Sequence, residues 1–93
     1  MDGEKLTKDL RMSNSKKAVV YVRLKDGVLD PQGVTIHKAL KQMGYDDFKS
    51  VRSGRFFELE IDAETNDIDR KIDEVCEKLL SNPVIENFTV EKN

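Results

Sequence analysis

The 93-residue chain has no tryptophan, one cysteine, one histidine and two prolines. A single cysteine excludes an internal disulfide, and one histidine without cysteines nearby gives little support for a metal site. No apolar run approaches the roughly 18 residues of a membrane span, and the first five residues do not resemble a signal peptide. We therefore expect a cytoplasmic protein with no membrane partner and no bound metal.

Neither sign of charge dominates the chain. The 16 Lys and Arg residues are interspersed with 18 Asp and Glu residues, and the net charge is −2. This balance argues against nucleic acid or an anionic membrane as the main partner. A domain of this size buries only about 60–65% of the surface that its unfolded chain exposes, so we expect it to associate with other chains.

The chain divides into two parts by composition. Residues 1–16 are polar with few apolar anchors, which predicts a disordered leader. Residues 17–93 are predicted to form a single domain. Cys76 lies on the apolar stripe of a predicted helix, so we interpret it as a small core residue in a reducing compartment.

The pattern of apolar residues predicts six elements. They are a strand at 19–24, a helix at 31–43, strands at 48–52 and 55–62 joined by a hairpin turn at Ser53-Gly54, a helix capped by Thr65 or Asn66 that Asn82-Pro83 ends, and a strand at 84–90. This βαββαβ order predicts a two-layer α+β domain, close to the ferredoxin-like arrangement. Its four-stranded, mainly antiparallel sheet would carry both helices on one face.

The turn after the first strand is rich in specific residues. Asp30 is a predicted N-cap, with Pro31 at the first helical position, and Gly27 permits the sharp exit from the strand. Gly33 would let another backbone approach closely. Four residues exceed what the turn needs and are candidates for partner contact: Val28, Leu29, Gln32 and Gly33.

The predicted sheet has one open face. The side chains facing the helices would be Val20, Val22, Leu24, Phe57 and Leu59. Three apolar side chains, Val19, Tyr21 and Phe56, would then point the other way, which is more than a solvated face needs. We expect a second copy of the domain, or a larger partner, to cover them.

The chain offers no evident catalytic group. No serine, carboxylate or glycine cluster forms a nucleophile–base pair, a carboxylate pair or a phosphate loop, and His37 is interpreted as a surface residue. An RNA-recognition module, with bases stacked on Tyr21 and Phe56, is a weaker alternative. Glu58 and Glu60 would share that face and repel phosphates. The prediction is a chain with no chemistry of its own.

Several stretches resemble the small subunit of phosphoribosylformylglycinamidine synthase, the PurS family. The resemblance covers 17–93 and is carried by Val20-Tyr21-Val22-Arg23-Leu24-Lys25, Gly27-Val28-Leu29-Asp30-Pro31-Gln32-Gly33, Ala39-Leu40, Gly44-Tyr45, Val51-Arg52-Ser53-Gly54-Arg55 and Cys76-Glu77-Lys78-Leu79-Leu80-Ser81-Asn82-Pro83-Val84-Ile85-Glu86. It implies a non-catalytic subunit that forms dimers or higher oligomers and bridges a large synthetase subunit and a glutaminase subunit in purine synthesis. The resemblance also implies that ATP and Mg²⁺ bind to the large subunit, and that glutamine-derived ammonia passes between the two enzymes.

Two surfaces are the candidate sites. The predicted partner interface combines the first turn (Val28, Leu29, Gln32, Gly33) with an exposed basic hairpin tip (Arg52, Gly54, Arg55), which could donate charge-assisted hydrogen bonds to an acidic partner. The predicted face for a homodimer or homotetramer is Val19, Tyr21 and Phe56. Two alternatives remain: the tip is an ordinary solvated turn, or the chain is a stand-alone regulatory or ligand-binding domain of ferredoxin-like shape.

Overall fold

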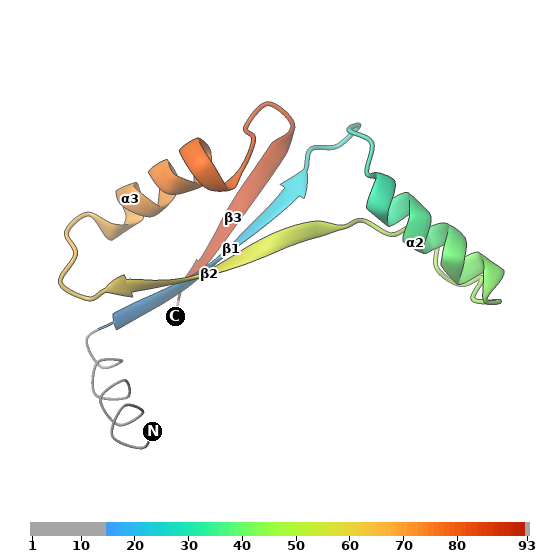
Figure 1. Ribbon diagram of the computed structural model, residues 1–93, viewed down its shortest axis with the longest axis horizontal. Coiled ribbons are helices and arrows are strands. Elements are labelled where there is room, and N and C mark those ends of the chain that lie inside the picture. The colour runs from blue at the N-terminus through green and yellow to red at the C-terminus, as the bar shows by residue number, and fades with distance from the viewer. Residues whose placement is uncertain (1–14, 93) are drawn as a thin grey trace, which may run out of the picture.

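The computed structural model describes residues 15–92 (Figure 1). Along the chain they form β1 (Ser15–Leu24), α2 (Pro31–Gln42), β2 (Gly54–Asp62), α3 (Ile68–Val75), η1 (Cys76–Leu80) and β3 (Glu86–Lys92). Element η1 is a π-helical turn that continues α3. The predicted leader lies outside the described residues, except that Ser15 and Lys16 are the first residues of β1.

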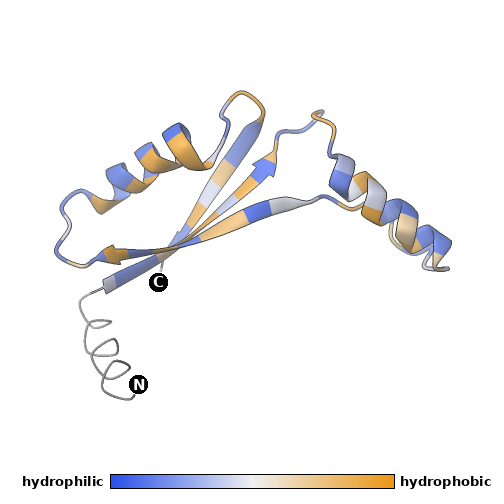
Figure 2. Ribbon diagram, viewed as in Figure 1, coloured by the Kyte–Doolittle hydropathy of each residue, from blue (hydrophilic) through white to orange (hydrophobic). Residues whose placement is uncertain are grey.

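The three strands form one antiparallel sheet in the order β2-β1-β3. The central strand β1 alternates between a buried and an open face, and Ala18, Val20 and Val22 are buried. Ile72 of α3 and Cys76 of η1 pack against them and are also buried. The partly buried side chains around this core are Phe57, Leu59, Ile61, Ile68, Leu80, Phe88 and Val90. The predicted inward positions of Val20, Val22, Phe57 and Leu59 and the core position of Cys76 are therefore confirmed, whereas Leu24 is half-buried outside this cluster. Figure 2 shows hydrophilic and hydrophobic bands following one another along β2.

The predicted four-stranded sheet is wrong, because residues 48–52 form no strand. Both edges of β1 are already paired, with β2 on one side and β3 on the other. The segment instead returns along α2, where His37 Nε2 donates to the Phe48 carbonyl oxygen (2.7 Å). The rings of Tyr45 and Phe48 lie edge to face, with centroids 6.4 Å apart.

The prediction that both helices cover one face of the sheet is also wrong. Only α3 and η1 pack on the sheet, whereas α2 projects beyond its end (Figure 1). The apolar side chains of α2 therefore stay exposed: Val34 by 51%, Ile36 by 41% and the following Met43 by 68%. The radius of gyration is 18.3 Å, against roughly 12 Å for a compact domain of this length. An apolar stripe shows which side of a helix is suited to burial. It does not show which surface, in the same chain or in another, will bury that side.

The helix ends follow simple chemistry. Helix α2 begins after Asp30, as predicted, and ends before Gly44, whose φ of 92° closes the helix in the left-handed region. Helix α3 begins one or two residues later than the predicted caps Thr65 or Asn66 imply, with Asp67 at φ 56° as its N-cap residue. No helix within residues 15–92 combines the length and the hydropathy that crossing a bilayer requires.

Shortening a side chain of the helix formed by α3 and η1 should lower the free energy of unfolding strongly at a core position and little at an exposed one. Ile72 is 4% exposed and Leu79 is 77% exposed. We expect Ile72→Ala to lower the free energy of unfolding by about 2–5 kcal/mol, because it leaves a cavity in the core. Leu79→Ala removes as many carbon atoms but should stay within about 0.5 kcal/mol of the wild type. Urea denaturation of both variants measures the difference, and equal losses would contradict this core.

Candidate functional site

Asp30 joins the start of α2 to the start of β2. Its Oδ1 accepts from the backbone N–H of Gly33 (3.0 Å), which makes it the N-cap that the sequence predicts. The same carboxylate accepts from the backbone N–H of Ser53 (2.6 Å) and from the Ser53 hydroxyl (2.7 Å). The three donors fix the entry to the projecting helix relative to the sheet.

These hydrogen bonds favour the charged form of the Asp30 carboxylate. They lower its pKa from 3.8 to about 2, and the bond from the Ser53 backbone N–H is the largest cause. The carboxylate is therefore ionised throughout the neutral and mildly acidic range. Its negative charge also lies at the N-terminus of α2, where the helix dipole favours an anion.

Gly33 permits close packing within the chain. It is buried, and a Cβ at this position would lie 2.4 Å from the carbonyl oxygen of Val51. The close backbone approach that the sequence predicts is therefore an approach of residues 48–53 to α2. Of the other residues in this turn, Val28 is half-buried, while Leu29 and Gln32 are exposed.

The predicted basic hairpin tip is wrong. Gly54 pairs with Arg23 of β1 rather than turning between two strands, and a Cβ on Gly54 would lie 2.6 Å from the Val22 carbonyl oxygen. Arg52 Nη2 donates to the carbonyl oxygen of Leu24 (2.7 Å). The residues around Gly54 therefore hold the end of the sheet together.

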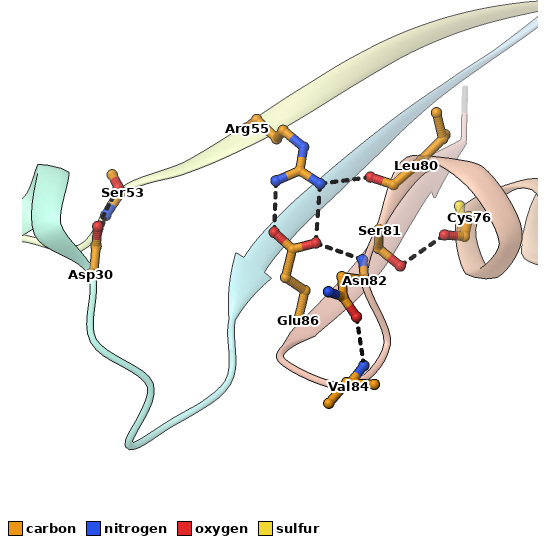
Figure 3. A network of polar contacts seen from close by, with 9 residues as sticks. All are labelled: Asp30, Ser53, Arg55, Cys76, Leu80, Ser81, Asn82, Val84 and Glu86. Carbon is orange, nitrogen blue, oxygen red and sulfur yellow. Dashed lines mark hydrogen bonds and ion pairs between the residues drawn. The ribbon is translucent and has the colours of Figure 1, made fainter.

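Arg55 is tied to the far edge of the sheet (Figure 3). Its guanidinium makes a bidentate ion pair with Glu86 of β3, at 2.6 and 3.0 Å, and donates to the Leu80 carbonyl oxygen (2.9 Å). Glu86 also accepts from the backbone N–H of Asn82 (2.6 Å). This network crosses β1 and closes the turn between η1 and β3.

The pairing shifts the pKa values of both partners. The hydrogen bonds from Arg55, and then the one from Asn82, lower the pKa of Glu86, whose side chain is only 9% exposed. The carboxylate of Glu86 in turn raises the pKa of Arg55. Both side chains therefore keep their charges, and the sequence alone gave no indication that these two residues meet.

Two exposed apolar loops lie at the same end of the sheet. The backbone N–H of Lys25, after β1, donates to the Ile85 carbonyl oxygen (2.8 Å) of the loop before β3. The side chains of Leu29 and Val84 on these loops are 73% and 80% exposed. We call this pair of loops, residues 25–30 and 82–85, the loop end. The sequence identifies Leu29 as a candidate for partner contact. It identifies Asn82-Pro83 only as the end of a helix, and so gives no indication that Val84 is part of an exposed loop.

The open face of the sheet carries the predicted apolar side chains. Val19 and Tyr21 are half-buried, and Phe56 is 60% exposed. The Tyr21 and Phe56 rings contact each other with centroids 6.2 Å apart, and the guanidinium of Arg23 lies 5.6 Å from the Tyr21 ring centre. Within residues 15–92, no helix covers this face.

The cysteine and carboxylate side chains of residues 15–92 give no support for a metal site. No three His, Cys, Asp or Glu side chains within residues 15–92 gather as metal ligands. Burial raises the pKa of the Cys76 thiol, which disfavours the thiolate that a metal would need.

The contribution of the ionised Asp30 carboxylate to folding stability should disappear at low pH. Because its pKa is lowered on folding, its stabilisation is complete above pH 3.8 and is lost as the pH falls through about 2. We expect Asp30→Asn to be less stable than the wild type at pH 7, with the difference shrinking between pH 4 and pH 2. Chemical denaturation at both pH values measures it. Asp26→Asn, which removes an exposed carboxylate of the same loop, is the control, and a pH-independent difference for Asp30→Asn would contradict the assignment.

Removing the Arg55 guanidinium should destabilise the fold. Arg55→Ala leaves the largely buried Glu86 without its ion-pair partner, which we expect to lower the free energy of unfolding by about 1–3 kcal/mol. Arg70→Ala breaks only exposed ion pairs within α3 and should change it by at most about 0.5 kcal/mol. If thermal or urea denaturation gives both variants the same stability, Arg55 is an ordinary surface residue.

Comparison with known proteins agrees with this architecture. The PurS family model, for phosphoribosylformylglycinamidine (FGAM) synthase, matches residues 17–93. The FGAM synthase subunit PurS of Bacillus subtilis strain 168 is 47% identical over 75 residues, covering 81% of this chain and 89% of that protein. A structure of B. subtilis PurS has a TM-score of 0.78 at 45% identity and covers 84% of this chain and 98% of that chain.

A chain in the structure of PurLQS from Thermotoga maritima is also similar. It has a TM-score of 0.75 at 31% identity, with coverage of 85% of this chain and 98% of that chain. The matches therefore extend over nearly the whole length of these relatives. The chain belongs to the PurS family of FGAM synthase subunits.

Proposed function

We propose that this chain is the non-catalytic small subunit of an FGAM synthase in purine biosynthesis, where it bridges the synthetase and glutaminase subunits. The observation that carries the proposal is the family match over 17–93, together with the likeness to a chain of PurLQS. The structure supports it because the domain exposes three separate apolar surfaces. These are the open sheet face, the loop end and the apolar side of α2.

The open face of the sheet is proposed to contact a second copy of this chain. Tyr21 and Phe56 form an aromatic pair at its centre, with Val19 beside them. Within residues 15–92 of one copy only five apolar residues are buried, so the extra burial would stabilise the fold as well as the oligomer. A dimer built through this face leaves the loop ends and both α2 helices available.

The loop end is proposed to contact another subunit. Of the predicted partner residues in the first turn, Leu29 and Gln32 are exposed, and Gly33 is buried. Arg52, Gly54 and Arg55 are exposed as well, but each also makes a contact within the chain. Leu29 and Val84 each give one of these loops an exposed aliphatic tip, and a hydrogen bond from Lys25 to Ile85 joins the two loops. Such a tip suits the apolar centre of an interface with a polar rim.

Bridging has a physical purpose in a reaction that uses ammonia. Ammonia released into bulk water is diluted and protonated, whereas an enclosed route between two active sites keeps its effective concentration high. A small domain that holds the synthetase and the glutaminase together can complete such a route without touching the reaction. ATP and Mg²⁺ would then bind to the large subunit, as the resemblance to the PurS family implies.

Reconstitution tests the proposal directly. We expect glutamine-dependent FGAM synthesis by the synthetase and glutaminase subunits to require this chain, while synthesis from added ammonium salt should proceed without it. This chain alone should have neither activity. Product formation measured with each nitrogen source, with and without the chain, distinguishes a bridging subunit from a stand-alone regulatory domain. Equal glutamine-dependent rates in both cases would refute bridging.

A pair of leucines provides the matched control for the loop end. Leu29 and Leu79 are exposed to a similar degree, 73% and 77%, but only Leu29 belongs to the loop end. Leu29→Asp should lower the glutamine-dependent rate at least about tenfold if Leu29 is a central contact. Leu79→Asp should leave that rate unchanged. Equal effects of the two variants would place the contact elsewhere.

A further inference from the structure

A pocket of about 340 Å³ lies at the end of the sheet where β2 begins. Gly54 of β2 is opposite Arg23 of β1 in the strand register, so β2 contributes no side chain to this row. The rings of Tyr21 and Phe56, in the next row of the open face, form one wall of the pocket, and Arg52 lines it just before β2 begins. We call this the Gly54 pocket. It combines an apolar wall with a few polar groups, as small-molecule sites commonly do.

The Gly54 pocket is basic. Of the residues within 15–92 that line it, three are arginines, at positions 23, 52 and 55, and none is acidic. The ion pair with Glu86 already neutralises Arg55. Arg23 and Arg52 make no ion pair with any residue in the described part of the chain. Two positive charges at one pocket therefore remain available to an anion.

Both of these guanidinium groups are held in place by the fold. Arg52 uses one N–H group, on Nη2, to donate to the carbonyl oxygen of Leu24 (2.7 Å), and its other N–H groups remain. This bond brings Arg52 to the end of β1, next to Arg23, which precedes Leu24. The guanidinium of Arg23 lies 5.6 Å from the centre of the Tyr21 ring. Donors that are ordered in advance lose less conformational entropy when a ligand binds.

The acidic side chains of the open face lie further along the strands. They are Glu58, Glu60 and Asp62 of β2 and Glu91 of β3, with Lys17 of β1 in the same region. Glu58 follows Gly54 by four residues, which is about 13 Å along a strand. This distance exceeds the Debye length of about 8 Å at physiological ionic strength. An anion in the Gly54 pocket therefore meets little repulsion from this group.

One carboxylate lies closer to the pocket. The charge of Arg52 contributes to the lowered pKa of Asp30, so the two side chains are near each other. The Asp30 carboxylate is already bound by three donors from Gly33 and Ser53. It therefore does not take up the free N–H groups of Arg52, which remain for a ligand.

We propose that the Gly54 pocket binds the phosphate group of a small molecule, with Arg23 and Arg52 as the residues that hold it. A phosphate presents several oxygen atoms, so it can accept hydrogen bonds from two guanidinium groups at once. The pocket is larger than a phosphate alone requires, and its aromatic wall suits a sugar or a base attached to it. The ligand class is therefore a sugar phosphate or a nucleotide. The site is separate from the proposed bridging role and does not depend on it.

Calorimetry and thermal unfolding of the full chain test this site. The probes are inorganic phosphate, ribose 5-phosphate and adenosine 5′-phosphate, compared at constant ionic strength with ribose and adenosine. We expect saturable binding of the phosphate-bearing compounds, one per chain, and a rise in the unfolding midpoint as their concentration increases. Ribose and adenosine should have no effect. Tighter binding of adenosine 5′-phosphate than of ribose 5-phosphate would identify a nucleotide, and equal binding would identify a sugar phosphate.

Two arginine variants and one matched control locate the site. R23Q and R52Q should each weaken binding of the phosphate compounds at least about tenfold, because each removes charge-assisted hydrogen bonds. R70Q removes an exposed arginine of α3 that lies outside the pocket and should bind like the wild type. R52Q also loses the bond to Leu24, so circular dichroism must confirm that it is folded. Within residues 15–92 Arg23 makes no hydrogen bond or ion pair, and R23Q should therefore fold like the wild type.

Three results would overturn the proposal. They are the absence of saturable binding of any phosphate compound at millimolar concentration, binding that R23Q and R52Q leave unchanged, and equal weakening by R70Q, which would show only general screening of charge. The reconstitution assay is read separately from these measurements. A chain that supports glutamine-dependent synthesis but binds no phosphate compound refutes the pocket alone, and a chain with the reverse behaviour refutes bridging alone.

Discussion

The alternation of side chains along β1 is the constraint on which the rest of the structure depends. Its even-numbered residues Ala18, Val20 and Val22 are buried under α3 and η1, and its odd-numbered residues Val19 and Tyr21 lie on the open face. Because β1 is paired on both edges, it sets the register of the whole sheet. A slip of one residue would exchange the two faces and remove the core.

Sequence periodicity was sufficient for the parts of the fold that depend on local chemistry. The Asp30 cap, the left-handed glycines at 27 and 44, the inward strand residues and the core position of Cys76 all follow from short-range patterns, and the structure agrees with them. The first helix could be located within one residue at its C-terminal end. Local patterns could also identify the apolar side of α2, but they could not show that the sheet formed by residues 15–92 leaves it uncovered.

The errors concern contacts between residues far apart in the chain. Residues 48–52 have strand-like composition, but the sheet has no free edge on β1 for them, and they lie along α2 instead. Arg55 is exposed, as the sequence predicts, but its ion-pair partner Glu86 lies 31 residues later and could not be predicted. Periodicity carries no information about such a pair. The family resemblance indicated the role of the chain but did not assign individual side chains to the fold or to the surface.

The polar links and the exposed apolar surfaces are two parts of one arrangement. Asp30 fixes the start of α2 to Ser53, Arg55 closes the turn that precedes β3, and Lys25 holds the two tips of the loop end together. Elements that pack little on the core are thereby held in place, so their apolar side chains are presented in a defined geometry. Because these elements are already ordered before association, less conformational entropy is lost when a partner binds. A domain with so small a core can therefore act as a rigid connector, since its polar groups stabilise its shape and its apolar groups remain available to other chains.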